Sequence, residues 1–218
     1  LDQARVDAVS LWTKLRQLSG EQRVQEQARI QQLIAQQPWP PGFQAELEMR
    51  VATLAGDVTT LWAVRSSATN EDAAGMSAAG LYRTTLGEPL AAVLRSIRDC
   101  WISVWDERVC QYLFHSGADS PCPAMAVVIQ PMLHAQVAGV AYSIHPVTGR
   151  TSQVSINAVP GLAWSLVSGE VTPDQFVVEV RDEDHRPFRV RRRVVAHKQK
   201  KLTVTSVGVQ TESIPDSE

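Results

Sequence analysis

The sequence has few cysteines and no long apolar run. Its 218 residues contain Cys100, Cys110 and Cys122, an odd number with no close pair. This spacing argues against a disulfide framework and against a zinc site. No run reaches the roughly 18 apolar residues that span a bilayer, and the N-terminus has no basic segment followed by an apolar stretch. We therefore expect a cytoplasmic protein with reduced thiols and no membrane partner.

An excess of charge of one sign is also absent. The formal net charge is -2 and the pI is about 6.2, so the chain has no global attraction to nucleic acid or anionic lipid. Any anion binding must then be local. With 44% hydrophobic residues, the chain is able to bury a core as one or two globular domains. Leu1 is not a start methionine, and we expect the chain to be a piece of a longer protein.

The first part of the chain has helical periodicity. Apolar residues at near-helical spacing predict a helix that ends near Leu18, and Ser19-Gly-Glu-Gln22 is typical of a capping box that starts a second helix. The prolines of segment 38–41 end that helix. A third helix is expected over about 43–55, and one long helix over 90–115.

Strand patterns dominate the second half. They are expected at 126–129, 137–143, 154–158, 176–180, 188–195 and 202–207, after an earlier strand at 60–66. Helices followed by hairpin-linked strands predict an α+β fold with a mostly antiparallel sheet and packed helices. We expect a helical segment at 1–58, a nucleotide-binding domain at 59–208 and a polar tail at 209–218.

The most informative stretch runs from Ala63 to Asp72. An apolar approach ends in Arg65, followed by the small hydroxyl residues Ser66, Ser67 and Thr69. An arginine holds phosphate through a planar fork of donors, and small side chains let backbone N–H groups approach the same anion. The alternative is an ordinary turn in which Arg65 pairs with a neighbouring carboxylate, Glu71 or Asp72.

Three later stretches contain candidate site residues. An apolar strand ends at Gln130 and Met132, where an apolar slot with an amide suits a purine, although most such strands are simply core. His145 lies in a strand closed by a Pro-Val-Thr-Gly turn and has no clustered ligands, so a metal role is disfavoured. Asp174 and Gln175 stand at a strand entrance after a glycine turn.

Together these motifs resemble a known family. Segments 63–72, 127–132, 138–149 and 157–176 occur in the order and approximate spacing of the ATP-binding domain of phosphoenolpyruvate synthase, pyruvate phosphate dikinase and rifampicin phosphotransferase. The most specific is Val-Arg-Ser-Ser-Ala-Thr-x-Glu-Asp, and the resemblance covers roughly residues 40 to 205. It implies an ATP-grasp-like fold, in which two α+β lobes close on the nucleotide.

The resemblance also implies roles for residues and partners. Arg65 is expected to contact the ATP phosphates, with Ser66, Ser67 and Thr69 framing them, and Gln130, Met132 and Leu133 to lie beside adenine. Family members use ATP and Mg²⁺. They phosphorylate a histidine on a separate swivelling domain, which passes the phosphoryl group to pyruvate, forming phosphoenolpyruvate, or to another acceptor.

Several positions depart from the family pattern. Trp164 stands where a metal-binding glutamate is expected, and Arg83 stands at another carboxylate position. Because Mg²⁺ demands oxygen ligands, the remaining candidates are Asp174 and Gln175, with Glu170 as a third. The glycine-rich, lysine-bearing segment of an upstream lobe and the swivelling histidine motif are missing. We expect little turnover by this chain alone, and a degenerate domain that binds nucleotide or a partner without catalysis is the alternative function.

A basic stretch supports a competing function. Segment 189–201 holds seven cations that suit nucleic acid phosphates. Valines interleave the cations as in a strand, no aromatic stacking platform accompanies them, and an acidic run lies just upstream. We therefore expect no nucleic acid partner.

Overall fold

The computed structural model describes residues 2–55, 57, 59–71, 80–115, 122–180 and 188–215. These residues form two compact units that divide between Met132 and Leu133, inside the segment 59–208 that the sequence suggests as one domain. Helices and antiparallel sheets are both present, which confirms the α+β class. Among the helices of the described ranges, none has the length and apolar character needed to cross a membrane.

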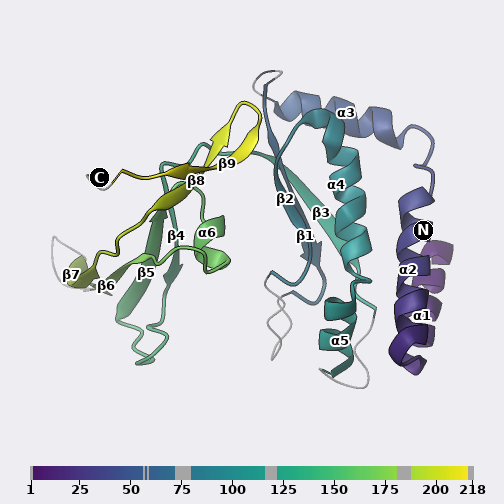
Figure 1. Ribbon diagram of the computed structural model, residues 1–218, viewed down its shortest axis with the longest axis horizontal. Coiled ribbons are helices and arrows are strands. Elements are labelled where there is room, and N and C mark those ends of the chain that lie inside the picture. Colours follow the sequence, from purple (N-terminus) through teal and green to yellow (C-terminus); the bar gives the residue numbers. More distant parts are fainter. Residues whose placement is uncertain are drawn as a thin grey trace. The chain divides into compact units, whose positions relative to one another are not determined.

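The first unit combines helices with a three-stranded antiparallel sheet of order β2-β1-β3 (Figure 1). Its elements are α1 (Asp2–Gln17), α2 (Gly20–Gln36), α3 (Phe43–Leu54), β1 (Trp62–Ala68), β2 (Thr84–Glu88), α4 (Leu90–Ser103), α5 (Glu107–His115) and β3 (Met125–Pro131). The three N-terminal helices and β1 lie close to their predicted positions. β2 has no counterpart in the sequence prediction.

The predicted capping box at the start of α2 is wrong in its chemistry. Ser19 stands at the N-cap position, but its side chain makes no capping hydrogen bond. Gly20 has a φ of 53°, outside the right-handed helical region, so the first turn is irregular. A regular first turn is what brings the N3 amide to the cap side chain.

The long helix predicted over 90–115 is also wrong, because it is two helices. The Ser103 hydroxyl donates a hydrogen bond to the carbonyl of Cys100 at 2.7 Å, which competes with the helical hydrogen bond of that carbonyl. The N–H of Cys110 then donates to the carbonyl of Asp106 at 2.9 Å and begins α5. A side chain therefore ends α4 at a position where the apolar periodicity continues.

One face of the three-stranded sheet is sealed by helices. Trp62 and Val64 of β1 are buried against Val93 and Ile97 of α4, together with Val51 of α3. Successive side chains of a strand point to opposite faces, so the same core receives alternate residues of β3. This buried layer supports the sheet from one side, and the described helices contribute to buried clusters on that face only.

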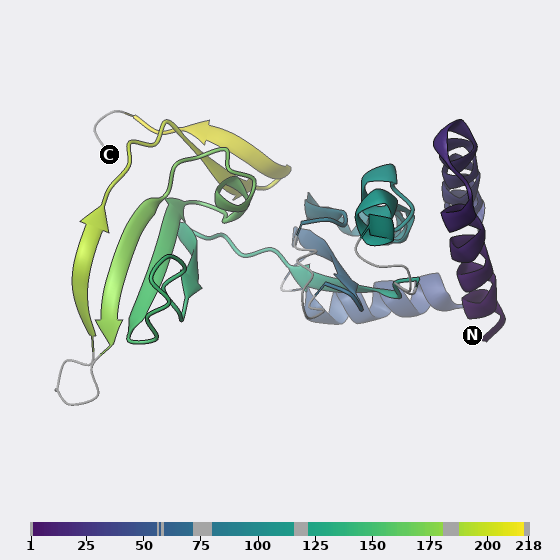
Figure 2. The same ribbon diagram turned by 90° about the horizontal axis from the view of Figure 1, so that it is seen from below.

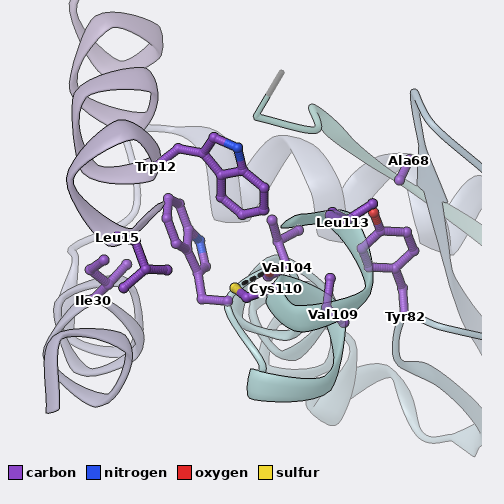
Figure 3. Close-up of a cluster of buried hydrophobic side chains, with 10 residues drawn as sticks. Trp12, Leu15, Ile30, Ala68, Tyr82, Val104, Val109, Cys110 and Leu113 are labelled. Carbon is purple, nitrogen blue, oxygen red and sulfur yellow. Dashed lines mark hydrogen bonds between the residues drawn. The ribbon is translucent and has the colours of Figure 1, made fainter. Parts of the chain in front are cut away.

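A second cluster joins the N-terminal helix pair to the rest of the unit. Trp12, Leu15 and Ile30 from α1 and α2 face Val104 and Cys110, as Figure 3 shows. The rings of Trp12 and Trp105 meet edge to face, with centroids 5.8 Å apart. The helices α1 and α2 thus pack on the region of α4 and α5, and α4 in turn packs on the sheet.

The second unit contains an antiparallel sheet of order β4-β5-β6-β7 and a separate hairpin, visible in green and yellow in Figure 2. Its elements are β4 (Val137–Tyr142), β5 (Gln153–Pro160), α6 (Trp164–Val167), β6 (Asp174–Val180), β7 (Phe188–Val194), β8 (Lys200–Thr205) and β9 (Gly208–Ser213). Residues 209–213, expected to be a polar tail, pair with β8 in the hairpin. Gly161 forms an isolated bridge with Leu202 and so connects the hairpin to the end of β5.

Candidate functional site

The second face of sheet β2-β1-β3, which no helix of the described residues covers and which we call the open face, presents a cation. Arg65 and Ser67 of β1 are exposed, whereas Trp62 and Val64 of the same strand are buried. Arg65 lies opposite Thr84 of β2 on one side and Val128 of β3 on the other. Cross-strand partners share a face of the sheet, so a guanidinium stands at the centre of the open face.

Gln130 belongs to the same face. It pairs with Ala63 and is two residues from Val128, which places it diagonally across from Arg65. Such diagonal neighbours lie about 7–8 Å apart, within reach of one extended ligand. The fold therefore brings together Arg65, Ser67 and Gln130, three of the residues singled out from the sequence.

Among the described residues, no side chain occupies the guanidinium of Arg65. Within the described ranges Arg65 has no hydrogen-bond or ion-pair partner, and Asp72 lies outside them. Glu71, the other carboxylate of the alternative interpretation, accepts hydrogen bonds from the Ser66 hydroxyl at 3.3 Å and from the Ala68 N–H at 3.0 Å. A guanidinium at this position offers a positive charge with a planar fork of donors.

Ser66 and Thr69 take part in the fold around the site. Ser66 lies between Arg65 and Ser67 on β1 and opposite the packed Val127, so it points away from the open face. Thr69 exchanges two hydrogen bonds with Ala124: its N–H donates to the carbonyl at 3.0 Å, and its hydroxyl oxygen accepts from the N–H at 3.1 Å. These contacts fix the end of β1 beside the start of β3.

A buried tyrosine anchors the loop that follows β1. The Tyr82 hydroxyl donates to Asn70 Oδ1 at 2.7 Å. Burial raises the pKa of Tyr82 to about 12, because the phenolate would lose its hydration, and the bond to Asn70 only partly offsets this. Tyr82 therefore remains a hydrogen-bond donor at neutral pH and holds Asn70 at the end of β1.

The remaining adenine candidates lie where the two units divide. The N–H of Met132 donates to the carbonyl of Leu61 at 2.8 Å, which extends the pairing of the first unit by one residue. Leu133 begins the second unit, and its side chain is 74% exposed. Met132 is thus fixed beside the sheet of the first unit, and Leu133 is an exposed apolar residue of the second unit.

Asp174 and Gln175 point to opposite faces of β6. Asp174 lies opposite Ala158, and Gln175 lies opposite Asn157. The carboxylate of Asp174 accepts a hydrogen bond from the Ala196 N–H at 2.9 Å and a short one from the Lys198 ammonium. Burial alone raises the pKa of Asp174, but the bonds from Lys198 and Ala196 outweigh it, so the pKa falls below its ordinary value.

This geometry does not fit a magnesium site made by the predicted ligands. Glu170 pairs with Lys200 at 3.5 Å, and Trp164, 44% exposed at the start of α6, offers no oxygen. The part of the chain that the structure describes contains no group of three His, Cys, Asp or Glu side chains able to hold a metal. Arg83, at the other departure from the family pattern, lies 3.8 Å from Asp99 on α4.

The basic stretch 189–201 is divided among acidic partners. Arg191 pairs with Glu179 at 2.6 Å, and Lys201 lies 3.7 Å from Glu212. Lys198 and Lys200 are engaged by Asp174 and Glu170, as described above. Four of the seven cations therefore have carboxylate partners, so the stretch is not a continuous positive surface.

Sequence reasoning missed two residues of the open face and one buried ion-pair partner. Thr84 and Val128 flank Arg65, and Val128 is 45% exposed although its side chain is apolar. The alternation of Ala126, Val128 and Gln130 with packed residues identifies this face only after β3 has been paired with β1. Lys198 was counted only among the cations of the basic stretch, since its partner Asp174 is 24 residues away.

Comparison with known proteins matches nearly the whole chain to one family. The family model described as pyruvate phosphate dikinase, AMP/ATP-binding domain, matches residues 6–218. A phosphoenolpyruvate synthase from Aeropyrum pernix is 34% identical over 184 residues, which are 81% of this chain and 22% of the relative.

Two further relatives are a second phosphoenolpyruvate synthase and a protein with another named activity. A phosphoenolpyruvate synthase from Pyrococcus furiosus is 36% identical over 139 residues, or 63% of this chain and 16% of the relative. A rifampicin phosphotransferase from Streptomyces sviceus is 41% identical over 122 residues, or 55% of this chain and 14% of the relative. The matched part of the chain thus spans about a fifth or less of the length of these curated relatives.

Proposed function

The chain belongs to the pyruvate phosphate dikinase AMP/ATP-binding domain family, and from this premise we propose that it binds ATP on the open face of sheet β2-β1-β3. Arg65 holds the phosphates, and Ser67 and Thr84 add hydroxyl donors beside it. Gln130 and the apolar surface of Val128 receive the nucleoside. The single observation that carries this proposal is an exposed arginine without a partner among the described residues, central on a sheet whose other face is sealed.

Rigidity makes this arrangement suitable for phosphate. Arg65 lies on the central strand, paired on both sides, and its neighbour Val64 is fully buried. A donor fixed by the fold needs little reorganisation as negative charge develops on a phosphoryl group. Arg65 would then stabilise that charge during transfer as well as in the bound state.

We further propose that the chain is the ATP-binding portion of a phosphoenolpyruvate synthase-like phosphotransferase with an ATP-grasp-like fold. In this proposal the γ-phosphoryl group passes from ATP to a histidine on a separate domain of the parent protein, and then to pyruvate or another acceptor. The similarity to phosphoenolpyruvate synthases and to a rifampicin phosphotransferase supports the class of reaction. We assign no step to magnesium, because the predicted ligands do not converge on one position.

The proposal is tested by calorimetric titration of the chain with ATP, before and after Arg65→Ala. Hydrogen bonds to charged groups contribute about 1.5–3 kcal/mol, so we expect affinity to fall about 10-fold to 150-fold. Because Arg65 is exposed and has no partner among the described residues, the free energy of unfolding should change by less than about 0.5 kcal/mol.

Arg95→Ala is the matched control. Arg95 is an exposed arginine on α4, the helix that covers the sealed face of the same sheet. Its removal changes the net charge equally but leaves the open face intact, so ATP affinity should stay within twofold of the unmodified chain, roughly the effect of one distant screened charge. Equal affinities of Arg65→Ala and Arg95→Ala, or no binding of ATP at millimolar concentration, would contradict the proposal.

A further inference from the structure

The sheet of the second unit has an apolar face that the described residues leave uncovered. A hollow of about 460 Å³ lies on this face and is lined only by apolar side chains of β5, β6 and β7. Val180, Phe188 and Val190 at one side of it are 47%, 67% and 56% exposed. The opposite face of the same strands carries Asn157, Gln175 and other polar residues. Contiguous exposed apolar surface on one face of a sheet marks an interaction site.

We propose that this apolar groove binds one amphipathic α-helix whose flank carries carboxylates. The width of the groove favours a single helix. Its bulky side chains come from three adjacent strands. Ile156 of β5 lies opposite Phe176 of β6, and Val180 of β6 lies opposite Phe188 of β7. Three strands span roughly 10 Å between the outer two, which is the diameter of one α-helix.

The fourth strand argues against a second sheet as the occupant. Beside the apolar side chains of β5, β4 places Gly139 and Ala141, opposite Ala158 and Ile156, while Val137 lies on the same face at the end of the strand, opposite Pro160. The side chains of Gly139 and Ala141 extend less far from the sheet than the bulky side chains of β5, β6 and β7. The face is therefore a groove rather than a flat layer. Packing of a sheet on a sheet requires interdigitating side chains across all strands.

The length of the groove sets the contact pattern of the helix. Phe176, Val178 and Val180 follow one another on the same face of β6, a span of roughly 13 Å at the rise of a strand. A helix covers that distance in about nine residues. The binding helix should therefore place apolar residues at i, i+3, i+4 and i+7 in the groove.

The charge at the edge of the apolar groove predicts which charge the side of the bound helix should carry. Arg193 lies opposite Phe176, and so on the apolar face, whereas Arg192 lies opposite Val177 on the other face. The only acidic residue of β6 on the apolar face, Asp174, is engaged by Lys198. A helix in the groove thus meets the guanidinium of Arg193 along its edge and is favoured when it presents a carboxylate there.

The test uses the full chain and two synthetic 16-residue helical peptides with leucine at i, i+3, i+4 and i+7. One carries glutamate on its flank and the other carries lysine. We expect the acidic peptide to bind the chain roughly threefold or more tightly than the basic peptide, the effect of one exposed ion pair. Phe188→Ser should weaken both peptides roughly tenfold, since one large apolar contact is lost.

Three variants control for general effects. Val147→Ser removes an 87% exposed apolar residue outside the groove and should leave binding unchanged. Arg193→Glu should reverse the preference in favour of the basic peptide, while Arg192→Glu, an identical charge change on the opposite face, should not. The reversed peptide preference of Arg193→Glu can be measured even if Phe188→Ser folds poorly.

Several results would overturn the inference. They are an absence of binding by either peptide, an equal effect of Arg193→Glu and Arg192→Glu, or an equal loss with Val147→Ser and Phe188→Ser. Light scattering over a range of chain concentrations provides a further check. A dimer that Phe188→Ser abolishes would identify a second copy of this chain as the occupant and would equally overturn the proposal of a helix.

Discussion

Replacement of Lys198 by methionine tests the buried ion pair of the second unit. The Lys198 side chain is only 7% exposed, and its ammonium donates to Asp174 and, at 2.9 Å, to the carbonyl of Ala196. Lys198→Met keeps a long side chain in the same space and removes the charge. Asp174 is then left with the Ala196 N–H, 2.9 Å away, as its hydrogen-bond donor in the described part of the chain.

The expected loss of stability follows from burial. A hydrogen bond to a charged group contributes about 1.5–3 kcal/mol when its partner is removed from a buried site. The Asp174 side chain is 25% exposed, so water partly replaces the lost ammonium and the cost falls in the lower half of that range. We expect the free energy of unfolding to fall by about 2 kcal/mol.

The dependence on pH gives a second readout with a definite sign. In the unmodified chain the pKa of Asp174 lies below 3.8, because the bonds from Lys198 and Ala196 outweigh burial. The pair therefore stabilises the fold at pH values above the pKa of unfolded aspartate and loses this contribution as pH falls through the lower folded-state pKa. In Lys198→Met the Lys198 ammonium no longer lowers the pKa of Asp174, so burial raises that pKa toward the value in the unfolded chain. The loss of stability on acidification therefore becomes smaller.

Urea unfolding followed by circular dichroism measures the first effect, and an NMR titration of the Asp174 carboxyl carbon measures the second. Arg191→Met is the matched control, because it breaks the more exposed pair with Glu179, whose side chains are 42% and 23% exposed. Its cost should stay below about 1 kcal/mol. The reasoning fails if Lys198→Met unfolds at the same urea concentration as the unmodified chain and leaves the pKa of Asp174 unchanged.

Two further predictions concern a glycine and a thiol. Gly161→Ala should cost more than about 2 kcal/mol in urea unfolding, because φ is 75° and an added Cβ would lie 2.0 Å from the Leu202 carbonyl oxygen. Gly149→Ala, with φ of 68° and open space, should cost only about 1–2 kcal/mol, and equal costs would refute the steric argument. Burial raises the pKa of Cys100 to about 11, so iodoacetamide at pH 8 should label it, by mass spectrometry, only after unfolding; native labelling at the rate of a free thiol would contradict this.

The predictable part of the fold is the part set by local periodicity. The N-terminal helices and most strands were found because apolar residues recur at the spacing of a helix or alternate as in a strand. β2 was missed because Thr84–Glu88 contains Gly87 and is followed by a proline, so it forms a strand only through pairing with β1. β9 was missed for a similar reason, since its polar residues pair with β8 at the surface.

For the proposed site, the sequence supplied candidate residues but not their arrangement. Arg65, Ser67 and Gln130 are candidates by residue type and resemblance, and the pairing of β1 with β3 places them on one face. The opposite orientation of Ser66 follows from strand alternation, but only once the boundary of β1 is known. The pairing of Asp174 with Lys198 could not be predicted from the sequence. The two residues are 24 positions apart, and only the register of β6 and β7 brings them together.

The most direct test of the ATP proposal is an NMR titration of the isotopically labelled chain with ATP, read at the backbone amides. The account predicts shifts concentrated at residues 65–67 on β1 and 128–130 on β3, together with Thr84 opposite Arg65. In Arg65→Ala these shifts should need about 10-fold or more ATP to develop. Shifts confined to residues of the sealed face or to other parts of the chain, with none on the open face, would contradict the account.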